Sequence, residues 1–264
     1  MKISSIHNQN ILALRKLFKN NERKNSDVFI TEGKKEVARG INSGYELLTI
    51  YFSPEIITKN ELSHFLSIIP SKTEIFYLDK LVYEKLAYRD NTEGIIGLFK
   101  KKTYTLNDIN PGAEDIVLIL ESIEKPGNLG AILRSADAAG IKAIILTETV
   151  IDQYNPNVIR SSLGAVFEIP VILSSNKDVR AWLTSNRFTS FSAALPSYKN
   201  LFELDFSGNI AFIFGSEANG LSDFWLDGES QTFTIPMKGI VDSLNVSVSV
   251  AVTIYEAIRQ KKSY

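Results

Sequence analysis

Runs of apolar residues separated by helix-like segments dominate the second half of this chain, and they restrict its fold more than any other feature. Residues 115–120, 143–146 and 209–214 are each almost continuously apolar. Strands buried on both faces have this composition, whereas half-exposed strands alternate apolar and polar residues. Residues 130–139, ended by Gly140, show a helical pattern between two of these runs. The alternation predicts an α/β fold with a mainly parallel sheet covered by helices on both faces.

Other segments of the second half extend this pattern. We expect two more strands at residues 167–173 and 233–236, and a helix at residues 179–185. Residues 244–257 are ambiguous, because valines at every second position from Val246 to Val252 suggest a strand. The segment is longer than a usual strand of about 5–6 residues, and a helical pattern continues beyond Tyr255. We therefore predict a long, buried C-terminal helix.

The first part of the chain has the pattern of a smaller α/β domain. Helical stripes at residues 11–20 and 32–43 accompany strand-like runs at residues 28–30, 47–52, 73–78 and 94–99. Residues 100–115 combine charge, asparagines and a Pro-Gly pair with little apolar content, which is typical of a linker. We place the boundary near residue 108, so the expected domains are residues 1–105 and 112–264.

Two scarcities in the composition exclude several classes of enzyme. The 264 residues include no cysteine and only two histidines, His7 and His64. This excludes disulfides, thiolate metal sites and cysteine nucleophiles, and it excludes a Ser-His-Asp triad in the last 200 residues. We expect no metal. No apolar run reaches the roughly 20 residues of a membrane span, and the N-terminus lacks the apolar core of a signal peptide. We therefore expect a cytoplasmic protein with no membrane partner.

Charge is distributed unevenly along the chain. Residues 1–110 carry 17 Lys and Arg against 13 Asp and Glu, a net of +4, and the remainder carries 12 against 17, a net of −5. Most of the excess positive charge lies in the first 39 residues. Such a patch can bind a phosphate backbone by releasing counterions, although a helix surface that merely keeps the protein soluble is the simpler explanation. The candidate residues for contacts with such a backbone are Arg15, Lys16, Lys34, Lys35 and Arg39.

Three motifs follow predicted strands of the second half. The first places Asn128-Leu129-Gly130 at a predicted helix start, with Arg134 one turn later. Free backbone N–H groups at such a position can face a ligand, but the glycine spacing differs from that of a dinucleotide-binding loop. The second motif is Gly215-Ser216-Glu217 with Gly220-Leu221, and the third is Ile235-Pro236-Met237 with Ser243-Leu244-Asn245-Val246-Ser247. Taken singly, these motifs are also explained by turns, helix caps and a surface salt bridge.

Taken together, the motifs resemble those of the SpoU branch of the SPOUT superfamily, RNA ribose 2′-O-methyltransferases that use S-adenosylmethionine. They occur in the family's order, and residues 160–165, Arg-Ser-Ser-Leu-Gly-Ala, match a further family segment. The resemblance covers residues 115–260. More loosely, the first part is similar to the ribosomal-protein-like RNA-binding domain that often precedes this catalytic domain, best at residues 31–37.

The resemblance implies a C-terminal α/β knot, in which the chain threads a loop to form a deep trefoil, a rare exception to unknotted topology. It implies that S-adenosylmethionine lies bent in this knot, held by Gly215, Ile235, Met237, Leu244 and Val246. It further implies a homodimer with RNA as its partner. Ribosomal RNA is favoured over transfer RNA, because this pairing of domains is frequent in ribosomal enzymes.

The resemblance also implies catalytic roles. Arg134 of the partner subunit would orient the ribose hydroxyl and its phosphate, since a guanidinium with a pKa above about 12 is a poor base. Asn128, Glu217 and Asn245 would hold Arg134 and the ribose in place. The alternative is a non-catalytic RNA-binding protein with a degenerate methyltransferase domain. The intact polar residues count against that alternative, and a test of S-adenosylmethionine binding separates the two.

Overall fold

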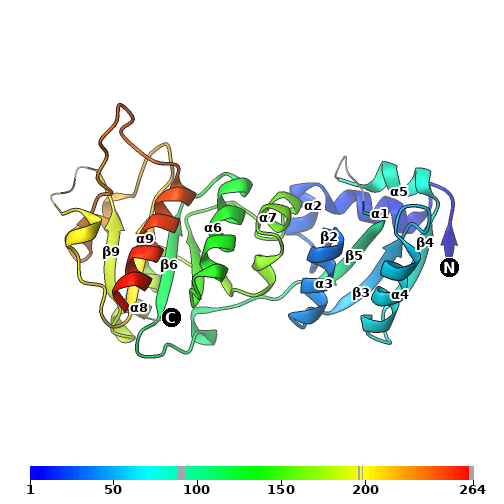
Figure 1. Ribbon diagram of the computed structural model, residues 1–264, viewed down its shortest axis with the longest axis horizontal. Helices are drawn as coiled ribbons and strands as arrows, with labels where there is room; N and C mark the ends of the chain where they lie inside the picture. Colours follow the sequence, from blue (N-terminus) through cyan, green and yellow to red (C-terminus); the bar gives the residue numbers. More distant parts are fainter. Residues whose placement is uncertain (89–92, 196, 198, 262–264) are drawn as a thin grey trace. The chain divides into compact units, whose positions relative to one another are not determined.

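The computed structural model describes residues 1–88, 93–195, 197 and 199–261, and the chain divides into two compact units (Figure 1). Residues 1–102 and 152–168 form the first unit. Residues 103–151 and the chain from residue 169 onward form the second. The chain therefore changes unit close to the predicted linker, and it does so again on either side of residues 152–168.

A five-stranded sheet forms the centre of the first unit, in the order β1-β4-β3-β5-β2. Strand β5 is antiparallel to both of its neighbours, whereas β4 is parallel to β1 and β3. The strands are β1 (Lys2–Ile3), β2 (Val28–Glu32), β3 (Leu47–Phe52), β4 (Glu74–Leu78) and β5 (Ile95–Lys100). The helices are α1 (Gln9–Leu17), α2 (Asn20–Lys24), α3 (Lys34–Asn42), α4 (Lys59–Ile68) and α5 (Lys80–Leu86).

Residues 152–168 pack with the first unit through aromatic rings and a buried ion pair. The segment contains α7 (Pro156–Ser161) and a short helical turn, η2 (Ala165–Phe167). The Tyr154 ring stacks on Phe29 with centroids 4.2 Å apart. The Arg23 Nε lies 2.5 Å from a carboxylate oxygen of Asp152, and the two side chains are only 1% and 7% exposed. A segment far along the sequence thus completes the core of the first unit.

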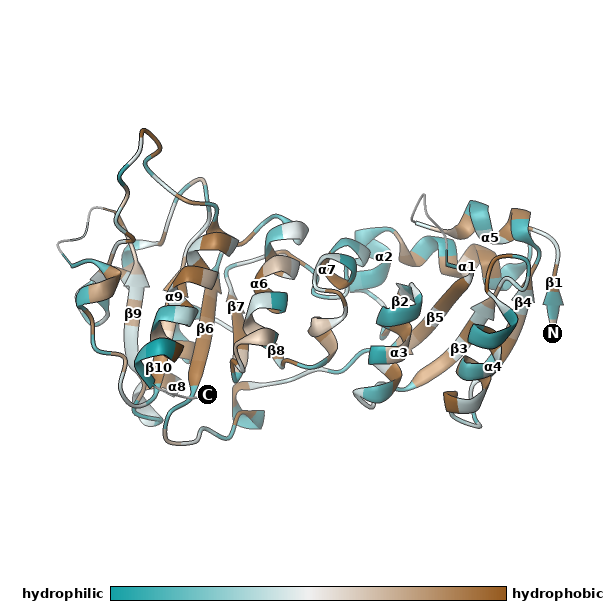
Figure 2. Cartoon of the chain, viewed as in Figure 1, coloured by the Kyte–Doolittle hydropathy of each residue, from teal (hydrophilic) through white to brown (hydrophobic). Residues whose placement is uncertain are grey.

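A six-stranded sheet of parallel pairs forms the second unit, in the order β11-β9-β10-β6-β7-β8. The central strand β6 is buried along its whole length and carries apolar colour in Figure 2. The strands are β6 (Ile116–Glu121), β7 (Ala143–Thr147), β8 (Val171–Leu173), β9 (Thr189–Ala193), β10 (Ile210–Phe214) and β11 (Gln231–Phe233). This confirms the predicted α/β fold with a mainly parallel sheet.

Three helices cover the second sheet. Helix α8 (Asn176–Ser185) packs Val179 and Leu183 into the core on one face of the sheet. Helices α6 (Pro126–Ala138) and α9 (Val246–Lys261) pack against each other, and β6 is visible between them in Figure 1. Short helical turns η1 (Leu106–Asp108), η3 (Leu201–Glu203) and η4 (Asp223–Trp225) lie in the connections. The topology that would define a trefoil knot remains a prediction.

Three sequence-based expectations need correction. Residues 233–236 were expected to form a strand, but β11 ends at Phe233. Residues 167–173 were expected to form one strand, but Phe167 ends a helical turn and only Val171–Leu173 is extended. Phe167 instead packs on Tyr45, with centroids 5.1 Å apart, in the first unit. The C-terminal helix forms as predicted, but it is not buried on every side. Val248 and Tyr255 are 45% and 44% exposed.

Candidate active site

Four connecting segments leave the second sheet at one edge. Strands β6, β9, β10 and β11 are linked by parallel pairing, so the residues that follow them emerge on the same side. In open α/β sheets, ligands bind outside these carboxyl ends. The three motifs lie in the segments after β6, β10 and β11. Strand order therefore brings together residues that are up to about 120 positions apart in the sequence.

The turn after β10 is closed by its own backbone. Ser216 N donates to Gly220 O at 3.1 Å, and Gly220 N donates to Ser216 O at 3.0 Å. A β-carbon on Gly215 would lie 2.0 Å from the Gly220 oxygen. Gly220 has a φ of +68°, a conformation that favours glycine. Both glycines of the motif are therefore required by the path of this turn.

A buried polar network anchors the far end of the same loop. Glu121, at the end of β6, is 2% exposed. Its Oε2 accepts from Ser222 N at 2.7 Å, and its Oε1 accepts from Ser222 Oγ and from Asn176 Nδ2, each at 2.6 Å. Asn176 Oδ1 in turn accepts from Trp225 Nε1 at 3.0 Å. A satisfied network of this kind makes its surroundings rigid, so the loop is held on both sides of Glu217.

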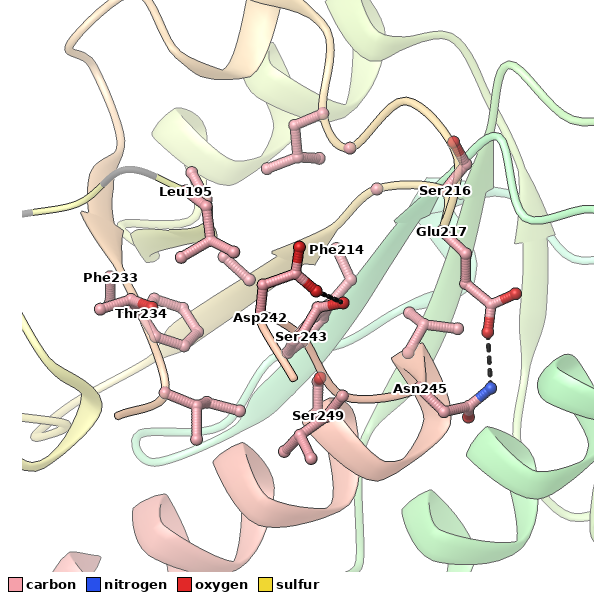
Figure 3. A pocket seen from close by; sticks show the side chains of 18 of the residues that line it. Leu195, Phe214, Ser216, Glu217, Phe233, Thr234, Asp242, Ser243, Asn245 and Ser249 are labelled. Carbon is pink, nitrogen blue, oxygen red and sulfur yellow. Dashed lines mark hydrogen bonds between the residues drawn. The ribbon is translucent and has the colours of Figure 1, made fainter. Parts of the chain in front are cut away.

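A pocket of about 660 Å³ opens between the turn after β10 and the connection from β11 to α9 (Figure 3). Its volume is in the usual range for small-molecule sites, about 300–1,000 Å³. Every residue predicted to hold the cofactor lines it: Gly215, Ile235, Met237, Leu244 and Val246. Figure 3 shows Glu217 and Asn245 at one end, with Leu195 and Phe233 toward the other.

Glu217 is the centre of a polar cluster at the end of this pocket. Its Oε1 accepts from Asn128 Nδ2 at 3.0 Å and from Asn245 Nδ2 at 2.5 Å. Asn245 Nδ2 also lies 3.3 Å from Asn128 Oδ1. The Lys125 ammonium forms an ion pair with Oε2. The structure thus brings three of the four predicted catalytic residues into mutual contact and adds a lysine.

The environment of Glu217 favours its ionised form. The hydrogen bond from Lys125 is the largest cause that lowers the pKa of this carboxyl, and the Asn128 amide lowers the pKa further. Lys125 was not among the predicted site residues. Its place directly before Pro126 at the start of α6, three residues from Asn128, was the available signal. Asp242, which also lines the pocket, was missed as well.

A second, smaller hollow adjoins the pocket. It has a volume of about 70 Å³ and shares Ser216, Glu217 and Val246 with the larger pocket. Lys125 and Asn128 line its other side. The Glu217 carboxylate therefore lies where the two spaces meet. A group in this position can contact a molecule in each space.

Arg134 lies apart from this cluster. It is exposed on α6, and within the described part of the chain its guanidinium has neither an ion pair nor a hydrogen bond. The hydrogen bonds that join the other three predicted catalytic residues, Asn128, Glu217 and Asn245, do not include Arg134 and form without it.

The predicted RNA-binding residues of the first unit differ in their contacts. Arg15, Lys16 and Lys35 are exposed. The Lys34 ammonium lies 2.6 Å from a carboxylate oxygen of Glu61. Arg39 is exposed, but its guanidinium donates to the Leu163 carbonyl at 2.6 Å. Of the five predicted residues, Arg15, Lys16 and Lys35 are thus the most available for contacts with RNA.

The described ranges contain neither a candidate metal site nor a helix that could span a membrane. Across residues 1–88, 93–195, 197 and 199–261, no three His, Cys, Asp or Glu side chains are grouped so as to hold a metal ion. In the same ranges, no helix has both the length and the apolar character needed to cross a bilayer.

Comparison with known families gives two matches. Residues 115–255 match the SpoU rRNA Methylase family, and residues 8–97 match the MRM3-like substrate binding domain. The first match contains all three motifs and nearly the whole second unit. The second contains the central strands and helices of the first unit.

Individual proteins resemble the chain over different lengths. The 23S rRNA (guanosine-2′-O-)-methyltransferase RlmB of Xylella fastidiosa is 38% identical over 152 residues, which are 57% of this chain and 61% of that enzyme. The chain thus spans about three fifths of the length of this relative. A crystal structure of an RNA 2′-O ribose methyltransferase is 33% identical, with a TM-score of 0.85, and covers 99% of this chain and 100% of its own. The AdoMet-bound rRNA methyltransferase of Sinorhizobium meliloti is 26% identical, with a TM-score of 0.88, over 98% of this chain and 97% of its own.

Proposed function

This chain belongs to the SpoU rRNA Methylase family, and on that premise we propose that it methylates a ribose 2′-hydroxyl of RNA with S-adenosylmethionine. Ribosomal RNA is the favoured substrate, because the similar proteins named above include a 23S rRNA 2′-O-methyltransferase and an rRNA methyltransferase. The observation that carries the proposal is the meeting of the motifs. All five predicted cofactor residues line one pocket, and the Glu217 cluster lies at its end.

The pocket suits a cationic cofactor. Glu217 and Asp242 are carboxylates, and among the described lining residues there is no Lys, Arg or His. S-adenosylmethionine supplies an activated methyl group on a positively charged sulfonium. The glycine turn at residues 215–220 leaves backbone groups exposed to the pocket, and Ile235, Leu244 and Val246 offer an apolar surface for a flat ring system. The knot expected from the family would hold these segments together.

The polar cluster would hold the acceptor ribose. Methyl transfer to a hydroxyl requires alignment of the two reactants, and alignment by itself can contribute about 7–11 kcal/mol. Asn128 and Asn245 are fixed by Glu217 Oε1, so their remaining amide groups have defined directions. The adjoining hollow gives the ribose access to the cofactor pocket. In this proposal these three residues orient the hydroxyl toward the methyl group.

We propose that the active site is shared within a homodimer. Val248 and Tyr255 lie two helical turns apart on α9 and leave an apolar stripe uncovered in one chain. Arg134 is exposed on α6, which packs against α9. A two-fold interface through α9 would cover the stripe and would allow Arg134 of the partner subunit to orient the ribose and its phosphate. Light scattering tests this directly, and a monomeric mass with full activity would contradict it.

The first unit is proposed to be the RNA substrate-binding domain, and the second the methyltransferase domain. Two features of the first unit support RNA binding. It matches a substrate binding domain, and its Arg15, Lys16 and Lys35 are exposed. We also propose a cytoplasmic location, which is consistent with a ribosomal RNA substrate.

Calorimetry and methyl-transfer assays test the proposed function. We expect S-adenosylmethionine to bind the purified protein, and tritiated methyl groups to enter ribosomal RNA from a strain that lacks the gene. Arg134→Ala should abolish transfer and leave cofactor binding nearly unchanged, because Arg134 does not line the pocket and takes no part in the hydrogen bonds of the cluster in the same chain. Normal turnover in this variant would refute the role of Arg134. If the wild type binds RNA but not the cofactor, the chain is instead a non-catalytic RNA-binding protein.

A further inference from the structure

Lys125 shares the carboxylate of Glu217 with the two asparagines of the site, yet none of the three motifs includes it. Its ammonium forms an ion pair with Oε2, whereas both amides donate to Oε1. A carboxylate has two oxygens and a terminal torsion that turns easily. Donors on one oxygen alone leave that rotation weakly restrained. Donors on both oxygens fix the plane of the group.

The backbone at the start of α6 places Lys125 for its contact with Glu217. Its carbonyl oxygen accepts from Asn128 N at 3.0 Å and from Leu129 N at 3.2 Å, as the first turn of the helix requires. Pro126 follows directly and fixes the helix start. Lys125 and Asn128 therefore extend from the same helical turn and reach opposite oxygens of one carboxylate.

Stability does not account for this ion pair. The Lys125 side chain is 69% exposed, and that of Glu217 is 28% exposed. Solvent screens such pairs, and exposed pairs contribute only about 0–1 kcal/mol to folding. The pair nevertheless lies on the wall of the small hollow beside the cofactor pocket. Its position fits a role in the reaction better than a role in folding.

We propose that Lys125 is a positioning residue for methyl transfer, acting through Glu217 to hold Asn128 and Asn245 in the orientation that aligns the ribose hydroxyl. This inference rests on the proposed function. Other charged groups facing the same spaces are Glu124, beside Lys125, and Asp242, from the connection between β11 and α9. Val246 and Ser249, the residues of α9 that line the pocket, are uncharged. Among the described residues that line the two spaces, Lys125 is therefore the one with a positive charge.

Two substitutions separate positioning from a general effect of charge. Lys125→Met keeps the aliphatic length and removes the ammonium, and Lys125→Arg restores a cation. The matched control is Lys142→Met, which removes a partly exposed lysine paired with Asp115 at 3.4 Å in the same unit. Rates are measured with tritiated S-adenosylmethionine and ribosomal RNA from the gene-deleted strain. The titration of Glu217 is followed by NMR of labelled glutamate, assigned with Glu217→Gln.

For Lys125→Met we expect kcat to fall by about 10- to 100-fold, the scale of a misalignment near 1 Å, with little change in the KM for the cofactor. Loss of the ammonium should raise the pKa of Glu217. As the pH falls, the carboxylate is then protonated at a higher pH than in the wild type, so the acid limb of the rate profile moves to higher pH. Lys125→Arg should recover most of the rate, and Lys142→Met should match the wild type.

Two results would overturn the inference. One is a Lys125→Met enzyme with normal kcat, an unmoved acid limb and an unmoved Glu217 titration. The other is a raised KM for RNA at unchanged kcat, which would make Lys125 a direct phosphate contact. Failure of the proposed function has a different signature, since the wild type would then neither bind S-adenosylmethionine nor methylate RNA. Even then, an unmoved Glu217 titration in Lys125→Met would contradict the inference.

Discussion

Replacing Gly215 with alanine tests whether the turn after β10 forms the cofactor pocket. The added β-carbon would lie 2.0 Å from the Gly220 oxygen, 2.1 Å from its carbonyl carbon and 2.4 Å from Leu221 N. All three atoms belong to the backbone, so no side chain can rotate away. The loop itself must move by more than about 1 Å to reach an ordinary contact distance.

The expected cost follows from two contributions. Overpacking of this kind costs about 1–3 kcal/mol. Movement of the loop also breaks the two hydrogen bonds between Ser216 and Gly220, which contribute about 0.5–1.5 kcal/mol each. We therefore expect the free energy of unfolding to fall by about 2–6 kcal/mol. The displaced wall should raise the Kd for S-adenosylmethionine by at least about 10-fold, or 1.4 kcal/mol.

Urea denaturation and calorimetry measure these two effects. The matched control is Gly127→Ala in α6, where a β-carbon meets nothing within 4 Å and alanine is favoured over glycine by up to about 1 kcal/mol. That variant should be at least as stable as the wild type and should bind the cofactor normally. A Gly215→Ala protein with wild-type unfolding midpoint and wild-type Kd would show that the turn is not as tight as its geometry indicates, and would refute the reasoning.

Three further predictions concern the first unit. Replacing Arg15 and Lys16 together with alanine should weaken RNA binding and reduce the slope of log affinity against log salt by about 1.4–1.8, because each lost phosphate contact removes about 0.7–0.9; an unchanged slope in a filter-binding titration would place the RNA elsewhere. Arg23→Ala should lower the free energy of unfolding in urea by about 3–5 kcal/mol, since it leaves the Asp152 carboxylate buried and unpaired, and Asp152→Asn tests the same pair from the other side. Hydrogen bonds from Lys34 and Thr58 lower the pKa of Glu61 to about 2. Its stabilising contribution should therefore be complete above its unfolded pKa of about 4.3 and be lost progressively as the pH falls from there through about 2, and an NMR midpoint near 4.3 in the folded protein would contradict this.

The buried ion pair changes how the first unit can be studied. Deleting residues 1–105 would leave Asp152, Tyr154 and Phe167 without the partners that cover them in the first unit. Point substitutions of exposed lysines and arginines avoid this damage. They are therefore the sharper test of RNA binding by the first unit.

The local sequence pattern was sufficient to predict the buried strands, the C-terminal helix and the motifs. Continuous apolar runs predicted β6, β7 and β10, because a strand covered on both faces is apolar along most of its length. The C-terminal helix was predicted from the length of its apolar pattern, although alternating valines pointed to a strand. The motifs were recognised because each follows a strand end, where glycine and polar residues have a specific geometric use.

Contacts between distant segments could not be read from the sequence. Phe167 was assigned to a strand because its neighbours are apolar, but it packs against Tyr45 of the first unit. The sequence analysis gave Lys125 no role, whereas the parallel order of β6 and β10 sets it beside Glu217. The arrangement of one carboxylate with two amides and an ammonium depends on strand order, which no local pattern encodes. Residue type and spacing determined which groups the site contains, whereas the tertiary structure decided which of them touch, because hydrogen bonds require distances of about 3 Å between atoms that the chain separates by tens of residues.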